Sequence, residues 1–66
     1  MKAVVNGEEW ELADGATVRD VLIRLGAPET GIAVACRGEV VPRPSWSDTA
    51  VHDGDDIEVL TAVQGG

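Results

Sequence analysis

The stretch KAVVNGEEWEL, residues 2–12, contains the turn that decides the fold. Asn6 and Gly7 both tolerate a positive φ, and this pair between two strand-like segments is the strongest short-range signal for a β-hairpin. Alternation of apolar and polar residues gives the hairpin one apolar face. We expect this face to contribute five side chains to the core: Met1, Ala3, Val5, Trp10 and Leu12.

The segment after the hairpin has the pattern of an amphipathic helix. Thr17 and Asp20 match a capping box, in which the threonine hydroxyl accepts a hydrogen bond from a first-turn amide. Gly26 favours a left-handed C-terminal cap, and Pro28 prevents the helix from continuing. We expect a helix over residues 18–25 with a single apolar stripe. The stripe consists of Val18, Val21, Leu22 and Leu25.

Three later segments have strand character. Residues 31–37, GIAVACR, alternate bulky and small side chains, and residues 40–41 predict a short edge strand that the following prolines end. Residues 57–63 predict a last strand, whose β-branched side chains favour an interior position in the sheet. Residues 44–54 show no period, and we expect a long loop anchored by Trp46.

The order of hairpin, helix and strands predicts an α+β fold of the ββαββ type. An amphipathic helix must cover the apolar face of a sheet, and a right-handed crossover through it places the first and last strands parallel and central in a mixed sheet. This arrangement is the β-grasp, or ubiquitin-like, roll. We expect residues 1–62 to form the β-grasp domain and residues 63–66 to form a flexible, free C-terminal tail.

The charge balance limits the partners. Twelve acidic residues against five Lys and Arg give the 66-residue chain a net charge of −7. This charge disfavours nucleic-acid backbones and anionic membranes, and it favours a protein partner with a basic patch. There is no long apolar run, and the single cysteine cannot form an intramolecular disulfide. We therefore expect a cytoplasmic protein that is a monomer when alone.

Cys36 and His52, with Asp53 to orient the imidazole, are the residues that could form a nucleophile–base pair. Strand alternation instead places the Cys36 thiol in the core, where a cysteine acts as a small and poorly reactive hydrophobe. The acidic segment 52–56 lacks the ligand spacing of a calcium loop, and no glycine-rich phosphate motif occurs. We predict no catalytic residues, no metal site and no cofactor bound by this chain.

The sequence ends in Val63, Gln64, Gly65 and Gly66. Because glycine has no side chain, such a tail can enter a slot too narrow for other residues and bring its carboxylate to a nucleotide phosphate in another protein. Four extended residues reach roughly 13 to 14 Å. A carboxylate is a poor acyl donor until it is activated, most simply as an acyl-adenylate. We therefore expect ATP and Mg to be used by a partner.

Strand alternation also predicts a partner surface. Several small or apolar residues face away from the expected helix, on the open side of the sheet next to the tail. Exposed apolar patches of this kind mark interaction sites. The predicted surface consists of Val4, Ala33, Ala35, Leu60 and Ala62.

Four segments resemble the ThiS family, the bacterial ubiquitin-like sulfur carrier proteins of thiamine biosynthesis. They are the NGE turn at 6–8, DGATVRDVL at 14–22, GEVVPR at 38–43, and GDDIEVL at 54–60 running toward the terminal Gly-Gly. Together they span essentially the whole chain.

The resemblance implies that a ubiquitin-activating-like adenylyltransferase adenylates the carboxylate of Gly66. Sulfur from a cysteine desulfurase system then converts it to a thiocarboxylate, and thiazole synthase takes that sulfur. It further implies that Gly65, Gln64 and Val63 insert into the partners, and that the protein is a cosubstrate rather than an enzyme. Cys36 departs from the aliphatic residue of many relatives, and we interpret it as a core filler rather than a resolving thiol.

Three other functions share parts of this pattern. A sulfur carrier for molybdopterin or cysteine synthesis has the same fold and the same Gly-Gly tail. A ubiquitin-like modifier conjugated to lysines is a second alternative, although Lys2 is the one lysine of the chain and gives polymeric chains little chemistry. An enzyme that uses Cys36 and His52 is the third.

Overall fold

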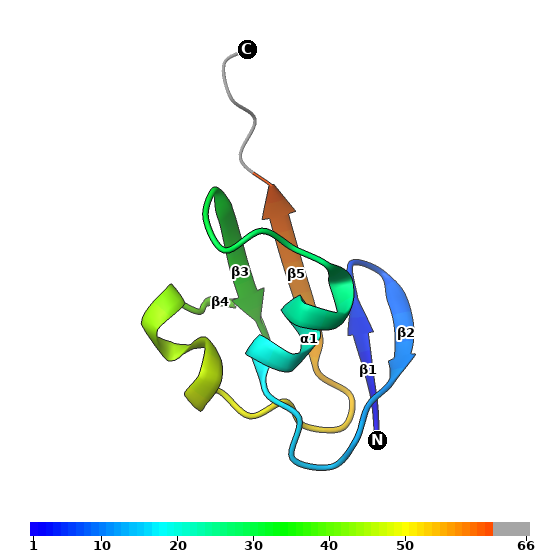
Figure 1. Ribbon diagram of the computed structural model, residues 1–66. Helices are drawn as coiled ribbons and strands as arrows, with labels where there is room; N and C mark the ends of the chain where they lie inside the picture. Colours follow the sequence, from blue (N-terminus) through cyan, green and yellow to red (C-terminus); the bar gives the residue numbers. More distant parts are fainter. Residues whose placement is uncertain (62–66) are drawn as a thin grey trace.

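A five-stranded mixed sheet carries one α-helix across one of its faces (Figure 1). This computed structural model describes residues 1–61. The predictions that concern Ala62, Val63, Gln64, Gly65 and Gly66 lie outside the described residues.

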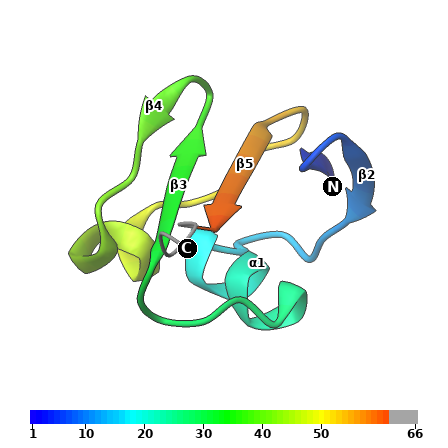
Figure 2. The same ribbon diagram turned by 90° about the horizontal axis from the view of Figure 1, so that it is seen from above.

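The sheet has the order β2-β1-β5-β3-β4, and β1 pairs with β5 in parallel. Seen from above, β5 lies between β3 and the β1–β2 hairpin, with α1 on one side of the sheet (Figure 2). The first and last strands are therefore interior neighbours, and the predicted β-grasp fold is confirmed. The elements are β1 Lys2–Val5, β2 Glu8–Glu11, α1 Val18–Leu25, β3 Ile32–Cys36, β4 Glu39–Val40, a 3₁₀ helix Arg43–Asp48 and β5 Asp56–Thr61.

The β1–β2 turn connects two parts of the sheet. Asn6 and Gly7 have φ values of +50° and +83°, so both central positions of the turn lie in the left-handed region as predicted. The Asn6 side chain also accepts a hydrogen bond from the Val59 amide at 2.8 Å. Asn6 thus takes part in the turn, and its side chain also extends the hydrogen bonding of β5 beyond the end of β1.

The helix has the predicted ends. The Asp20 amide donates to the Thr17 hydroxyl at 3.3 Å, and the Thr17 amide donates to the Asp20 carboxylate at 2.9 Å. At the other end, Gly26 is left-handed. Val18, Val21 and Leu22 of the predicted stripe are buried.

Leu25 was expected in the core, and the structure corrects this expectation, because its side chain is 38 % exposed. The chain reverses at Gly26, and the Ala27 amide donates to the Leu22 carbonyl at 3.1 Å. Ala27 packs against the core at this end of the helix.

The expected long loop over residues 44–54 contains a 3₁₀ helix, Arg43–Asp48, that the sequence analysis missed. Pro42 and Pro44 favour the φ angles of such a turn, and the Ser45 amide donates to the Pro42 carbonyl at 2.8 Å. Trp46 anchors the segment as predicted, because its indole ring is 3 % exposed and its Nε1 donates to the Val41 carbonyl at 2.9 Å.

The short edge strand lies one residue earlier than predicted. It is formed by Glu39 and Val40, while Val41 is buried and donates its amide to the Val34 carbonyl at 2.8 Å. The turn before it uses Arg37 and Gly38, with φ values of +55° and +80°. Because both turn residues are left-handed, the hairpin closes at its tightest length and β4 begins at once.

Candidate functional site

The base of the predicted tail is the end of β5. Thr61, the last described residue, pairs with Ile32, and Leu60 pairs with Ala33. On its other side β5 has passed the end of β1, and the hydrogen bond from the Val59 amide to the Asn6 side chain is the last one to that hairpin within residues 1–61. The strand thus carries the chain beyond β1, supported by β3 (Figure 1).

The predicted partner surface lies on the face of the sheet opposite to α1. Leu60 is 65 % exposed, Ala33 is exposed, and Val4 and Ala35 are half-buried. Val40, which is 77 % exposed and pairs with Ala35, belongs to the same face. We name these residues the open-face patch: Val4, Ala33, Ala35, Val40 and Leu60.

Val40 was missed because its segment was predicted one residue too late. The sequence has two adjacent valines and gives no sign of which one is buried. In the structure Val41 is buried, and because neighbours along an extended chain point to opposite faces, Val40 is exposed. Glu58 pairs with Ala35, and Asp56 pairs with Val4, so two carboxylates lie among the apolar side chains. This mixture fits a partner surface that is apolar and basic.

Asp55 is a buried carboxylate at the opposite end of β5. One of its oxygens, Oδ2, accepts from the Arg37 guanidinium at 2.5 Å and from the His52 amide at 2.7 Å. The Cys36 thiol lies 3.8 Å from the same oxygen. The carboxylate therefore ties the β3–β4 turn to the loop that precedes β5.

The nucleophile–base arrangement considered for Cys36, His52 and Asp53 is not assembled. The Cys36 thiol contacts Asp55, the His52 ring contacts Arg37, and the Asp53 carboxylate accepts from the Lys2 amide at 2.8 Å. Burial raises the pKa of the Cys36 thiol, and the Asp55 charge raises it further against the opposing charge of Arg37. The thiol is therefore a poor nucleophile at neutral pH.

Native protein is expected to react with a soluble thiol reagent at least about tenfold more slowly than the unfolded chain, because Cys36 is buried and must wait for the fold to open. Mass spectrometry of alkylation over time, in buffer and in denaturant, measures the two rates. Equal rates would contradict the core position of this thiol.

The pKa of Asp55 is shifted by opposing effects. Burial alone would raise it, but the hydrogen bonds from the His52 amide and the Arg37 guanidinium, together with the nearby positive charge, lower it overall. A carboxyl group with a lower pKa in the folded state stabilises the protein above its unfolded pKa of about 3.9. This contribution is lost as the pH falls through the folded pKa.

Asp55→Asn is therefore expected to lower the free energy of unfolding at pH 7 and to weaken its decline in acid below about pH 4. Urea unfolding at several pH values measures both effects. Asp48→Asn is the matched control, because Asp48 is exposed at the end of the 3₁₀ helix. Identical pH profiles for the Asp55→Asn and Asp48→Asn variants would refute the assigned role.

No group of three or more His, Cys, Asp or Glu side chains within residues 1–61 is placed to hold a metal ion. In the same part of the chain, no helix combines the length and hydrophobicity needed to cross a lipid bilayer.

Comparison with known proteins identifies the family. The ThiS family model matches residues 2–66. Over 66 residues the chain is 33 % identical to the sulfur carrier protein ThiS of Escherichia coli, and the alignment covers both chains completely. It is 39 % identical to a thiazole synthase of Paramagnetospirillum magneticum, but it spans only 20 % of the length of that relative.

The fold agrees with this assignment. The crystal structure of the thiamine biosynthesis protein ThiS from Geobacter metallireducens superimposes with a TM-score of 0.83 at 32 % identity, with both chains fully covered. The chain therefore belongs to the ThiS family.

Proposed function

We propose that this protein is a sulfur carrier of thiamine biosynthesis, which carries sulfur as a thiocarboxylate on Gly66. The observation that carries the proposal is the full-length match to a sulfur carrier protein ThiS, on a chain with the same fold as a solved ThiS. The position of the open-face patch supports it, because Leu60 lies three residues before Val63, the first residue of the tail.

The Gly66 carboxylate must be activated before it can accept sulfur. Its negative charge repels nucleophiles and it has no good leaving group, so a partner with bound ATP and Mg adenylates Gly66 and releases pyrophosphate. The terminal sulfur of a persulfide from the desulfurase system then displaces AMP from the acyl-adenylate and forms an acyl disulfide. A thiol, such as free cysteine, cleaves this bond, which releases the thiocarboxylate and leaves a disulfide. The thiocarboxylate is a soft nucleophile. Within this scheme the protein is a cosubstrate, and Cys36 takes no part because its thiol is buried against Asp55.

Three partners act in sequence in this scheme. A ubiquitin-activating-like adenylyltransferase activates Gly66, a cysteine desulfurase system supplies the sulfur, and thiazole synthase consumes it. The last assignment is supported by a relative named thiazole synthase, part of which is 39 % identical to this chain. Val63, Gln64 and Gly65 insert into each active site, while the open-face patch contacts the body of the partner.

Mass spectrometry tests the proposal. After incubation with ATP, Mg, the adenylyltransferase, a cysteine desulfurase and cysteine, the protein should gain the mass difference between one sulfur and one oxygen. Fragmentation should place this gain on Gly66. Cys36→Ser is expected to gain the same mass. Sulfur found on Cys36 and not on the C-terminal carboxylate would reject the carrier function.

Leu60→Asp is expected to slow adenylation by about tenfold or more, because a charged side chain in a desolvated contact loses a typical hot-spot energy. Pyrophosphate release measures the rate. Ile23→Asp introduces the same charge at an exposed position of α1, where 68 % of the side chain is accessible, and should leave the rate unchanged. Equal rates for these two variants would mean that the open-face patch is not the docking surface.

A further inference from the structure

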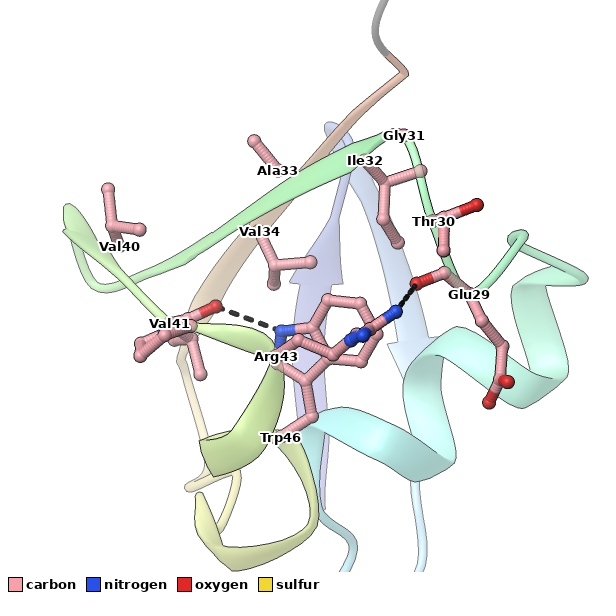
Figure 3. Close-up of a pocket in the computed structure, with 11 residues that line it drawn as sticks. Glu29, Thr30, Gly31, Ile32, Ala33, Val34, Val40, Val41, Arg43 and Trp46 are labelled. Atoms are coloured by element: carbon pink, nitrogen blue, oxygen red, sulfur yellow. Dashed lines mark hydrogen bonds between the residues drawn. The ribbon is translucent and has the colours of Figure 1, made fainter.

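A groove of about 370 Å³ lies between β3, β4 and the 3₁₀ helix (Figure 3). Trp46 and Val34 line its inner part, and Ile32, which pairs with Thr61 at the end of β5, lies at one end. The Arg43 side chain also lines the groove and donates to the Glu29 carbonyl at 3.2 Å. The groove is thus an apolar slot with a guanidinium at its rim.

The backbone of β3 leaves hydrogen-bonding groups on the groove side. The Arg37 amide donates to the Asp56 carbonyl, so alternate residues of β3, from Ala33 to Arg37, bond to β5. The amides and carbonyls of Ile32 and Val34 therefore point the other way, toward β4 and the groove.

The short strand β4 leaves most of these groups uncovered, although the Val34 carbonyl already accepts a hydrogen bond from the Val41 amide. β4 pairs only with Ala35 and Cys36, and the bond from the Val41 amide to the Val34 carbonyl is the last one before the chain leaves the sheet. The Val41 carbonyl accepts from the Trp46 indole. Within residues 1–61, no strand pairs with Ile32 on this side of β3.

The opposite edge of the sheet is protected. Three of the four residues of β2 are glutamates, namely Glu8, Glu9 and Glu11, and charged edge strands resist pairing with another chain. The groove edge of β3 has no such charges, because Ile32, Ala33 and Val34 form it. The two edges of this sheet therefore differ in their capacity to accept a further strand.

We propose that a protein partner adds an extended strand to β3 alongside Ile32, up to the point where Val41 bonds to the Val34 carbonyl. It places an apolar side chain in the groove beside Ile32 and a carboxylate beside Arg43. The backbone groups supply the pairing, and the alternate side chains supply the specificity. A carboxylate fits this position, because within residues 1–61 no acidic side chain lies within salt-bridge distance of Arg43.

The occupant is a segment of thiazole synthase, an identity that rests on the proposed function. Ala33 and Val40 belong both to the groove and to the open-face patch, so a partner that holds the tail also reaches β3. The relative from Paramagnetospirillum magneticum joins a region like this chain to a much longer thiazole synthase. Physical linkage of this kind raises the effective concentration of two domains that dock on each other.

Amide hydrogen exchange tests the strand addition directly. When thiazole synthase binds the unmodified carrier, the amide of Ile32 should gain protection. The amides of Glu9 and Glu11 point outward from the β2 edge and should exchange at the same rate as before. If the Ile32 amide gains no protection, or if no complex with thiazole synthase forms, the proposal is wrong.

A charge reversal tests the role of Arg43. Arg43→Glu should weaken binding to thiazole synthase by about tenfold or more, and Arg43→Lys should restore part of it. Arg24→Glu makes the same change in net charge near Trp10, on the other side of the molecule, and should bind like the unmodified protein. Equal losses in Arg43→Glu and Arg24→Glu would overturn the groove assignment.

Thiocarboxylate formation on Gly66 separates this proposal from the proposed function. It should proceed in every variant, because the adenylyltransferase acts before thiazole synthase. If the unmodified protein forms no thiocarboxylate, the sulfur-carrier function fails. If thiocarboxylate forms but Arg43→Glu binds thiazole synthase normally, only the groove assignment fails.

Discussion

Deletion of Gly66 is expected to abolish the mass gain from sulfur completely, while the domain keeps its free energy of unfolding. The reacting carboxylate would then belong to Gly65, one residue short of the distance that the partner active site requires. The buried core consists of residues between Ala3 and Val59, so this deletion removes none of its members. Intact-protein mass spectrometry and a urea unfolding curve measure the two quantities.

Gly65→Val is expected to have the same effect on sulfur transfer with the carboxylate still in place, because a branched side chain cannot enter a slot shaped for glycine. Thr61→Val is the matched control, since it introduces the same side chain at an exposed residue before the tail and should leave sulfur transfer unchanged. Full sulfur transfer in the Gly66 deletion would reject the carrier function and return the enzyme that uses Cys36 and His52 to consideration.

The hairpin and the helix could be predicted because their signals are local. Asn6 and Gly7 lie next to each other, and Thr17 and Asp20 are three residues apart, so each signal acts within one turn of chain. The parallel pairing of β1 with β5 could be predicted as well. The handedness of the crossover leaves few topologies for this order of elements.

The 3₁₀ helix could not be predicted because its stabilising contacts have no period. Two prolines and the side chain of Trp46 stabilise this short helix, and the Trp46 indole donates to the carbonyl of Val41, five residues away. The burial of the Asp55 carboxylate could not be predicted for a related reason. Its partners Arg37 and Cys36 are 18 and 19 residues distant in the sequence, and no local pattern reports such contacts.

The candidate site was predicted in part. Alternation along strands correctly placed Leu60 and Ala33 on the exposed face, but Val40 depended on an edge strand whose position was one residue in error. The groove beside β3 could not be predicted, because it forms where β4 ends early and the Val41 carbonyl accepts a hydrogen bond from the Trp46 indole. The residues of the tail lie outside the described part of the chain, so their roles stay predictions.

Leu22→Ala is expected to lower the free energy of unfolding by about 2 to 5 kcal/mol, because it removes buried methyl groups and leaves a cavity. Leu22 is 3 % exposed and packs from α1 into the core. A domain of this size has a total stability of only about 3 to 5 kcal/mol from a single core. The variant should therefore be largely unfolded at room temperature, as measured by circular dichroism and urea unfolding.

Ile23→Ala is the control that gives this result its meaning. Ile23 is the next residue of α1 and is 68 % exposed, so its truncation removes little buried surface. A surface substitution of this kind should change the free energy of unfolding by no more than about 0.5 kcal/mol. The higher helix propensity of alanine offsets part of any loss. If both variants lost stability equally, α1 would not pack on the sheet through the face that carries Leu22. The placement of the helix on the sheet would then be wrong.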